Sequence, residues 1–205
     1  MDLNVKGDPG SGNTYQQTDI QSVGSYNPAA TTSITHIHQD NRSTRMGAYF
    51  EKLQQEILAN VTSDMIDELR NYTTKLDGTK GLEEKLVDGG FSRSRIDEAC
   101  RLKEMYAKRA SKYDCYPSAQ QINIDLFARI KHEFNTFILP MIEDGEHVRR
   151  VMQEIRKQIV IPIRDLLDTC GANDDYLHYT EDHIYGMIYY LTGMCHLNWT
   201  DYDNI

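Results

Sequence analysis

Apolar residues recur at intervals of three and four along most of this chain, and this spacing predicts amphipathic helices. The first stripe begins at Met46 and includes Phe50, Leu53, Ile57 and Val61. Later apolar positions continue it, either directly or after a break near residues 62–63; they are Met65, Leu69, Tyr72 and Leu76. Residues 77–81 form a turn by composition.

Three further helices are predicted between residues 82 and 141. A short one over 82–87 is closed by Gly89-Gly90, and Ser92 or Ser94 caps the next, which runs to about Tyr113. Ser118 and Gln121 have the spacing of a capping box, so the third begins at Pro117-Ser118. Its apolar stripe is Ile122, Leu126, Ile130, Phe134, Phe137 and Met141.

A return helix follows the turn at residues 143–145. Its apolar stripe is Val148, Met152, Ile155, Ile159, Ile163 and Leu166. Pro140 and Pro162 fall late in these two long helices, where each should kink or end its helix. The residues we expect in the core are Leu126, Ile130, Phe137, Ile155 and Ile159.

The last helix opens at Thr180, a good N-cap residue, and carries Glu181 and Asp182 in its first turn. Gly193 stands where a left-handed C-terminal cap is needed. The stripe between them is Ile184, Met187, Ile188 and Leu191. The pattern as a whole predicts an all-α, multi-helix bundle.

Residues 1–45 differ from the helical region, residues 46–205. Of these 45 residues, 29 are Gly, Ser, Thr, Asn, Gln, Asp or Pro. Such a segment buries too little surface to offset its ordering entropy, so we expect it to be flexible or to become ordered on assembly. Residues 31–38 are β-prone and could form one short strand.

Six segments, in this order and spacing, resemble one known family. They include Arg101-x-Lys-Glu-x-Tyr-Ala-Lys-Arg109 and lie at residues 81–90, 96–112, 117–124, 134–140, 159–163 and 180–199. Over roughly residues 46–199 the chain is similar to the C-terminal domain of ABC-three-component anti-phage systems of bacteria, which are related to Lamassu. That domain usually follows an effector domain, but about 45 residues precede it here, so we expect no fused effector. The resemblance implies a non-enzymatic subunit that docks on an SMC-like ABC ATPase or a companion effector subunit.

Charge is distributed unevenly over a chain whose net charge is −9. Residues 92–113 carry seven basic and three acidic residues, whereas from Asp165 onward there are eight acidic residues and no Lys or Arg. Arg101, Lys108 and Lys112 share one helix face. That face is solvated, contacts a partner or a second copy of the chain, or binds nucleic acid through the 93–112 helix.

Aromatic residues near the C-terminus are the other interface candidates: Tyr185, Tyr189 and Trp199. Tyrosine tolerates half-burial, which favours an interface. For Trp199, the only tryptophan, the default interpretation is a buried anchor within the monomer, and an interface hot spot is the alternative.

Catalytic and cofactor motifs are weak. Residues 7–14 match a phosphate-binding loop except that Asn13 replaces its lysine, so we expect no nucleotide site. His36, His38 and Asp40 alternate and could hold a metal, which leaves a small metal-dependent nuclease as the enzymatic alternative. We otherwise predict no cofactor, no metal and no catalytic residue.

The sequence indicates a cytoplasmic protein. Its four cysteines are scattered, and it has neither a signal peptide nor an apolar run of 18 residues.

Overall fold

A computed structural model describes residues 44–76 and 80–200 of the chain. These residues belong to one unit, Asn41–Ile205, and contain helices and no strand, which confirms the predicted all-α class. The predictions for residues 1–43 and for the turn at 77–79 lie outside the described residues, as does the candidate metal site at His36, His38 and Asp40.

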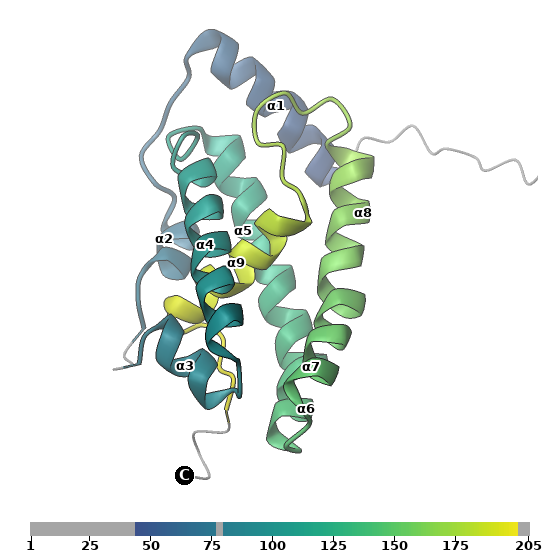
Figure 1. Cartoon of the computed structure of the whole chain (residues 1–205). Helices are drawn as coiled ribbons and strands as arrows, with labels where there is room; N and C mark the ends of the chain where they lie inside the picture. The colour runs from purple at the N-terminus through teal and green to yellow at the C-terminus, as the bar shows by residue number, and fades with distance from the viewer. Residues whose placement is uncertain (1–43, 77–79, 201–205) are drawn as a thin grey trace, which may run out of the picture. The chain divides into compact units, whose positions relative to one another are not determined.

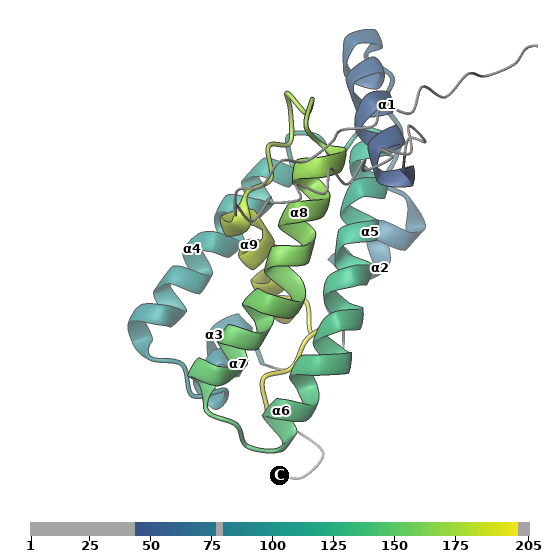
Figure 2. The ribbon, with the colours of Figure 1, turned by 90° about the vertical axis from the view of Figure 1, so that its right-hand side faces the viewer.

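The α-helices of this unit follow one another with short connections. Their bounds are α1 Arg45–Ala59, α2 Asp67–Thr73, α3 Leu82–Asp88, α4 Arg93–Ala110, α5 Pro117–Glu133, α6 Leu139–Glu143, α7 Val148–Ile155, α8 Ile161–Cys170 and α9 Glu181–Gly193. Two π-helical turns, η1 (Phe134–Ile138) and η2 (Arg156–Val160), join α5 to α6 and α7 to α8. The chain therefore forms two long antiparallel rods, α5–η1–α6 and α7–η2–α8, side by side (Figure 2).

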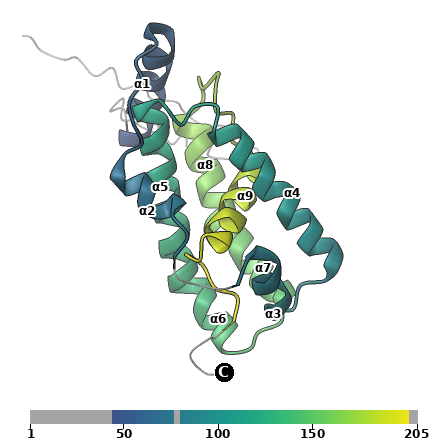
Figure 3. The same ribbon diagram turned by 90° about the vertical axis from the view of Figure 1, so that its left-hand side faces the viewer.

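Helix α9 is the centre of the bundle (Figures 1 and 3). It contacts α3, α4, α5 and α8, and most of its side chains are buried. Its closest neighbour is α4, and Gly186 lies at their crossing. A Cβ atom on Gly186 would stand 2.5 Å from the carbonyl oxygen of Leu102 and 2.7 Å from Cβ of Tyr106. The absence of a side chain at Gly186 is therefore what allows α4 and α9 to approach so closely.

The two π turns explain where Pro140 and Pro162 fall. Leu139 N–H donates to the carbonyl of Phe134, and Ile161 N–H donates to that of Arg156, each across five residues. Each proline comes directly after the donor, as the second residue of the following helix. A proline inside a regular helix lacks a donor and clashes with the carbonyl four residues earlier. A wider turn before each proline keeps the rod continuous.

The same wide turn overturns the prediction that Phe137 is core. Phe137 is 43% exposed, whereas Phe134 and Ile138 are fully buried. A π turn has more residues per turn than an α-helix, so a step of four, not three, keeps the chain on the buried face. The other four predicted core residues are confirmed, each 0% exposed; they are Leu126, Ile130, Ile155 and Ile159.

Two predicted helix ends are also wrong. Ser118 does not cap α5 with Gln121; its N–H and hydroxyl donate to the carboxylate of Glu56, at 2.9 and 2.8 Å. A carboxylate from α1 thus satisfies the first turn of α5, where the helix dipole favours negative charge. Gly193 is the last helical residue of α9, and the left-handed residue is Cys195, at φ 64°.

Other predicted boundaries are close to those observed. Thr180 is the N-cap of α9. Of the two alternatives after the first stripe, the break is observed, but it begins at Asn60, a left-handed residue that precedes the expected positions 62–63. Val61 therefore leaves the stripe and is exposed. Ser92 occupies the N-cap position of α4 but its side chain makes no cap hydrogen bond, and the helix ends at Ala110, three residues early.

Candidate interaction surfaces

The basic helix and the start of the acidic C-terminal helix are neighbours within this chain. Helix α4 packs along α9, whose first turn carries Asp182. The pKa of Arg101 is raised chiefly by its hydrogen bond to Glu98 and more weakly by the charge of Asp182. Some of the positive charge of α4 is therefore balanced by acidic residues of the same molecule.

The three basic interface candidates are all exposed. Arg101 forms two hydrogen bonds to the carboxylate of Glu98, at 2.8 and 2.5 Å. Lys108 is on α4, but Lys112 lies beyond the end of the helix, so the predicted helical face of three cations is shortened to two. Among the described residues, neither lysine makes an ion pair.

Two carboxylates of the acidic region make hydrogen bonds or ion pairs within the chain. Asp174 accepts hydrogen bonds from the backbone N–H groups of residues 176–178. Glu181 pairs with Arg156 at 2.5 Å and with Arg164 at 2.8 Å, which ties the start of α9 to the rod that contains α8. These contacts lower the pKa of Glu181.

Of the aromatic candidates, Trp199 and Tyr189 are 3% and 5% exposed. The indole N–H of Trp199 donates to Thr192 Oγ1 at 3.0 Å, and its ring meets Phe91 and Phe134 edge-on, at centroid distances of 4.9 and 5.4 Å. Trp199 is therefore the internal anchor of the default interpretation. Tyr185 is half-buried beside Arg156, and it alone of the three presents appreciable surface.

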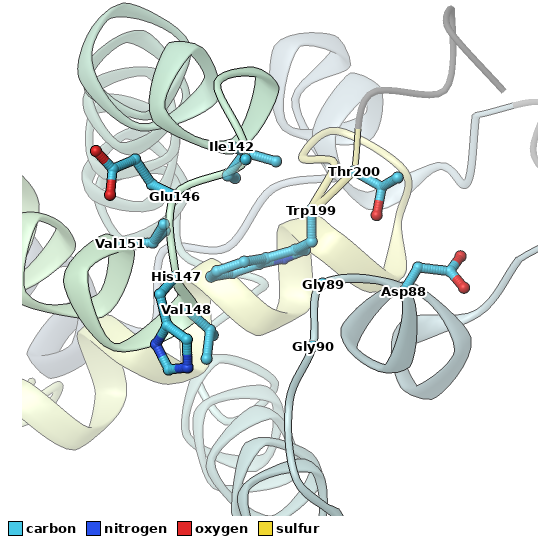
Figure 4. A pocket seen from close by; sticks show the side chains of 11 residues that line it. Asp88, Gly89, Gly90, Ile142, Glu146, His147, Val148, Val151, Trp199 and Thr200 are labelled. Carbon is cyan, nitrogen blue, oxygen red and sulfur yellow. The ribbon is translucent and has the colours of Figure 1, made fainter.

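A groove opens beside Trp199, which we call the Trp199 groove (Figure 4). Its volume is about 480 Å³. The end of α3 forms one wall and the turn between α6 and α7 forms the other, with the indole of Trp199 between them. The residues that line it are Asp88, Gly89, Gly90, Ile142, Gly145, Glu146, His147, Val148, Val151, Trp199 and Thr200.

Gly89 is what allows Trp199 to lie against α3. A Cβ atom on Gly89 would be 2.8 Å from Cβ of Trp199 and 3.2 Å from its carbonyl oxygen. Gly90 has φ +76°, a left-handed conformation that favours glycine. The Gly89-Gly90 pair indicated a helix end in the sequence, but nothing there showed that it faces a residue over 100 positions away.

A buried lysine, which the sequence pattern did not single out, holds the segment before Trp199. Lys85 is 4% exposed, and its amine donates to the carbonyl of Leu197 at 3.3 Å and to Asn198 Oδ1 at 2.9 Å. Burial lowers the pKa of Lys85. Lys85 shares the buried face of α3 with Leu82 and Leu86. Because a lysine side chain is usually exposed, its residue type conceals this role in the sequence.

Two histidines near the C-terminus contact neighbouring groups of the bundle. Among the described residues, no group of three His, Cys, Asp or Glu side chains could hold a metal ion. His183 Nδ1 accepts from the N–H of Thr180 at 3.2 Å, which completes the cap of α9, and His196 packs on Tyr72.

The helices in residues 44–76 and 80–200 include none with the length and hydrophobicity that a membrane span needs.

The profile of one protein family matches this chain over residues 81–199. That family is described as CTD9, C-terminal domain 9 of the ABC-three component (ABC-3C) systems. The match runs from the residue before α3 to Trp199, and so includes both walls of the Trp199 groove. No curated protein and no solved structure matches the chain.

Proposed function

Because this chain belongs to the CTD9 family, the C-terminal domain 9 of ABC-three-component systems, we propose that it is a non-enzymatic interaction subunit of an anti-phage defence complex. It docks on the SMC-like ABC ATPase of its system or on a companion effector subunit, in the cytoplasm. The observation that carries the proposal is the family match over α3–α9, the segment that supplies the central helix of the bundle.

Surface chemistry supports a role in binding. The matched region exposes Val87 and Phe137, at 59% and 43%, and contains the Trp199 groove. Single exposed apolar side chains are common on protein surfaces, so the groove is the feature that supports binding, since concave apolar surface is typical of contact sites.

A second candidate function is nucleic-acid binding through the C-terminal end of α4. The observation that favours it is the exposure of Lys108 and Lys112, which are without an ion pair in the described residues. Two lysines would supply a small phosphate contact, against a chain charge of −9. Binding to a partner protein is therefore the function that we put first.

The test is a phage challenge of cells that carry the complete system, with and without this gene. We expect deletion to abolish protection, and the tagged protein to co-purify with the ATPase or companion subunit from the same cells. An ABC ATPase from an unrelated system serves as the co-purification control. Full protection without the gene would contradict the proposal.

A further inference from the structure

A second pocket, which we call the Tyr190 pocket, lies where helices α2, α4, α5 and α9 meet. Its volume is about 280 Å³. Its walls include Leu69 on α2, Ala110 on α4, Phe127 on α5 and Tyr190 on α9, together with Met65 from the segment before α2. The spaces between the helices of a bundle are a common place for a binding site, which makes this pocket a candidate.

Most polar groups that line the Tyr190 pocket have partners within the chain. The hydroxyl of Tyr106 donates to Asn123 Oδ1 at 2.9 Å. The hydroxyls of Thr73 and Ser111 each donate to the backbone carbonyl three residues earlier, at 3.2 Å. These groups are therefore already satisfied and ask nothing of an occupant.

Two polar groups of the lining have no partner among the described residues. They are the carboxylate of Asp114 and the hydroxyl of Tyr190. Asp114 is exposed and Tyr190 is half-buried. Of the described residues that line the pocket, only Asp114 is charged. The lining therefore offers one anionic acceptor and one hydroxyl beside an apolar and aromatic wall.

Charges near the pocket do not reverse this sign. Lys108 and Lys112 are close to Asp114 in the sequence, but neither lines the pocket or pairs with that carboxylate. Asp64 and Glu68 are exposed, and each is adjacent in sequence to a lining residue on the α2 side. Cations and anions are thus balanced around the pocket, and the lining itself is negative.

We infer that the Tyr190 pocket receives the side chain of an arginine from the partner subunit. This inference rests on the proposed function and names the surface and the chemistry of the contact. The methylene groups of the arginine lie against the apolar wall, and its guanidinium donates to the Asp114 carboxylate and to the Tyr190 hydroxyl. Arginine is one of the residue types that carry most of the binding energy at protein interfaces.

The chemistry of the lining favours arginine over other occupants. An apolar side chain would cover the Asp114 carboxylate and the Tyr190 hydroxyl without giving either a partner, which costs free energy. The guanidinium of arginine is more weakly hydrated than the ammonium of lysine and stacks on aromatic rings. The phosphate backbone of a nucleic acid would be repelled by Asp114.

The size of the pocket favours a side chain over a free ligand. A volume of about 280 Å³ lies just below the ~300–1,000 Å³ typical of pockets that enclose a whole small molecule. One side chain that belongs to a larger partner needs less room.

The first arm of the experiment titrates the full chain with N-acetyl-argininamide, N-acetyl-lysinamide and the neutral N-acetyl-norleucinamide. The methyl NMR signal of Met65 reports binding. We expect argininamide to give a saturable shift, lysinamide a weaker one and norleucinamide none. Asp114→Asn should weaken argininamide binding roughly threefold, the size expected for an exposed ion pair. The matched control, Asp175→Asn, removes an exposed carboxylate outside the lining and should bind like the natural chain.

The second arm measures the affinity of the full chain for the purified ATPase and companion subunits encoded beside it. We expect Asp114→Asn to weaken binding roughly threefold or more. Ser111→Trp, at an exposed position of the lining, covers the pocket without changing its charge and should weaken binding at least as much. Asp175→Asn is again the control, and circular dichroism checks that each variant remains folded.

The outcomes separate this inference from the proposed function. If the natural chain binds neither subunit, the proposed function fails and this inference fails with it. If the natural chain binds, and Asp114→Asn and Ser111→Trp bind as tightly, the pocket is excluded while the proposed function stands. Argininamide that gives no saturable shift, or that binds no better than lysinamide, would also overturn the inference.

The source of the arginine is read by cross-linking. A photoreactive benzoylphenylalanine replaces Lys112, which is exposed near the pocket but does not line it, and is activated in the complex. We expect the cross-linked peptide to come from the partner subunit and to contain arginine. Cross-links confined to a second copy of this chain, or to a partner peptide without arginine, would contradict the assignment.

Discussion

Phe137 and Ile138 are adjacent, yet their surroundings are opposite. Phe137 is 43% exposed on η1, and Ile138 is fully buried. The N–H of Leu139 reaches back five residues to Phe134, so the turn is one residue wider than an α-helical turn. This widening turns Ile138 toward the core and Phe137 toward solvent.

Truncating these two side chains should therefore have unequal effects. Ile138→Ala should lower the free energy of unfolding by about 2–5 kcal/mol, because it leaves a cavity in a closely packed core. Phe137→Ala should lower it by less than about 1 kcal/mol, as expected for an exposed site. Urea denaturation of the two variants checks this. Equal losses would show that η1 does not orient the two residues as described.

The helices could largely be predicted at the element scale, since apolar spacing alone indicates where a chain can bury one face. Several of their ends, and all of their crossings, could not. The N-terminus of α5 is capped by Glu56, which lies on α1. The position of Trp199 depends on Gly89, which is also distant in the sequence. The Trp199 groove needs three separate segments to meet, so no local pattern marks it.

The packing of α9 on α4 gives a prediction at this scale. Gly186→Ala would place a methyl group 2.5 Å from the Leu102 carbonyl, so we expect a loss of about 1–3 kcal/mol from overpacking, despite the better helix propensity of alanine. Gly193→Ala, in the same helix, is the matched control. Its nearest contact would be an ordinary 3.6 Å to Lys103, so it should be neutral or slightly stabilising. Thermal unfolding of both variants measures the difference, and an unchanged midpoint for Gly186→Ala would contradict the close approach.

Buried polar groups join distant segments of the whole bundle. Asn123 Oδ1 accepts from the hydroxyls of Tyr106 and Tyr179, at 2.9 and 3.0 Å. Gln120 accepts from the N–H of Ile66 at 2.6 Å and donates to the carbonyl of Asp114 at 2.7 Å. These bonds tie α5 to α4 and to the loops that precede α9, α2 and α5. Because buried polar groups need their partners, the bonds favour one arrangement of the bundle.

Two histidines make this arrangement sensitive to acid. Burial lowers the pKa of His183 and of His196 below the ordinary value of 6.5. Between the lowered values and 6.5 the unfolded chain binds more protons than the folded one, so stability is lost as the pH falls through that window. We expect the urea midpoint to fall between pH 7 and pH 5, and to fall less in His196→Gln. A variant with the same pH dependence as the natural chain would remove His196 from this effect.

Sedimentation velocity of the purified protein, mixed with its cognate ABC ATPase or companion subunit, tests most directly whether this chain is a binding subunit. We expect a new, faster-sedimenting species at micromolar concentrations with at least one of the two. Independent sedimentation from both, with every component folded and at low salt, would contradict it.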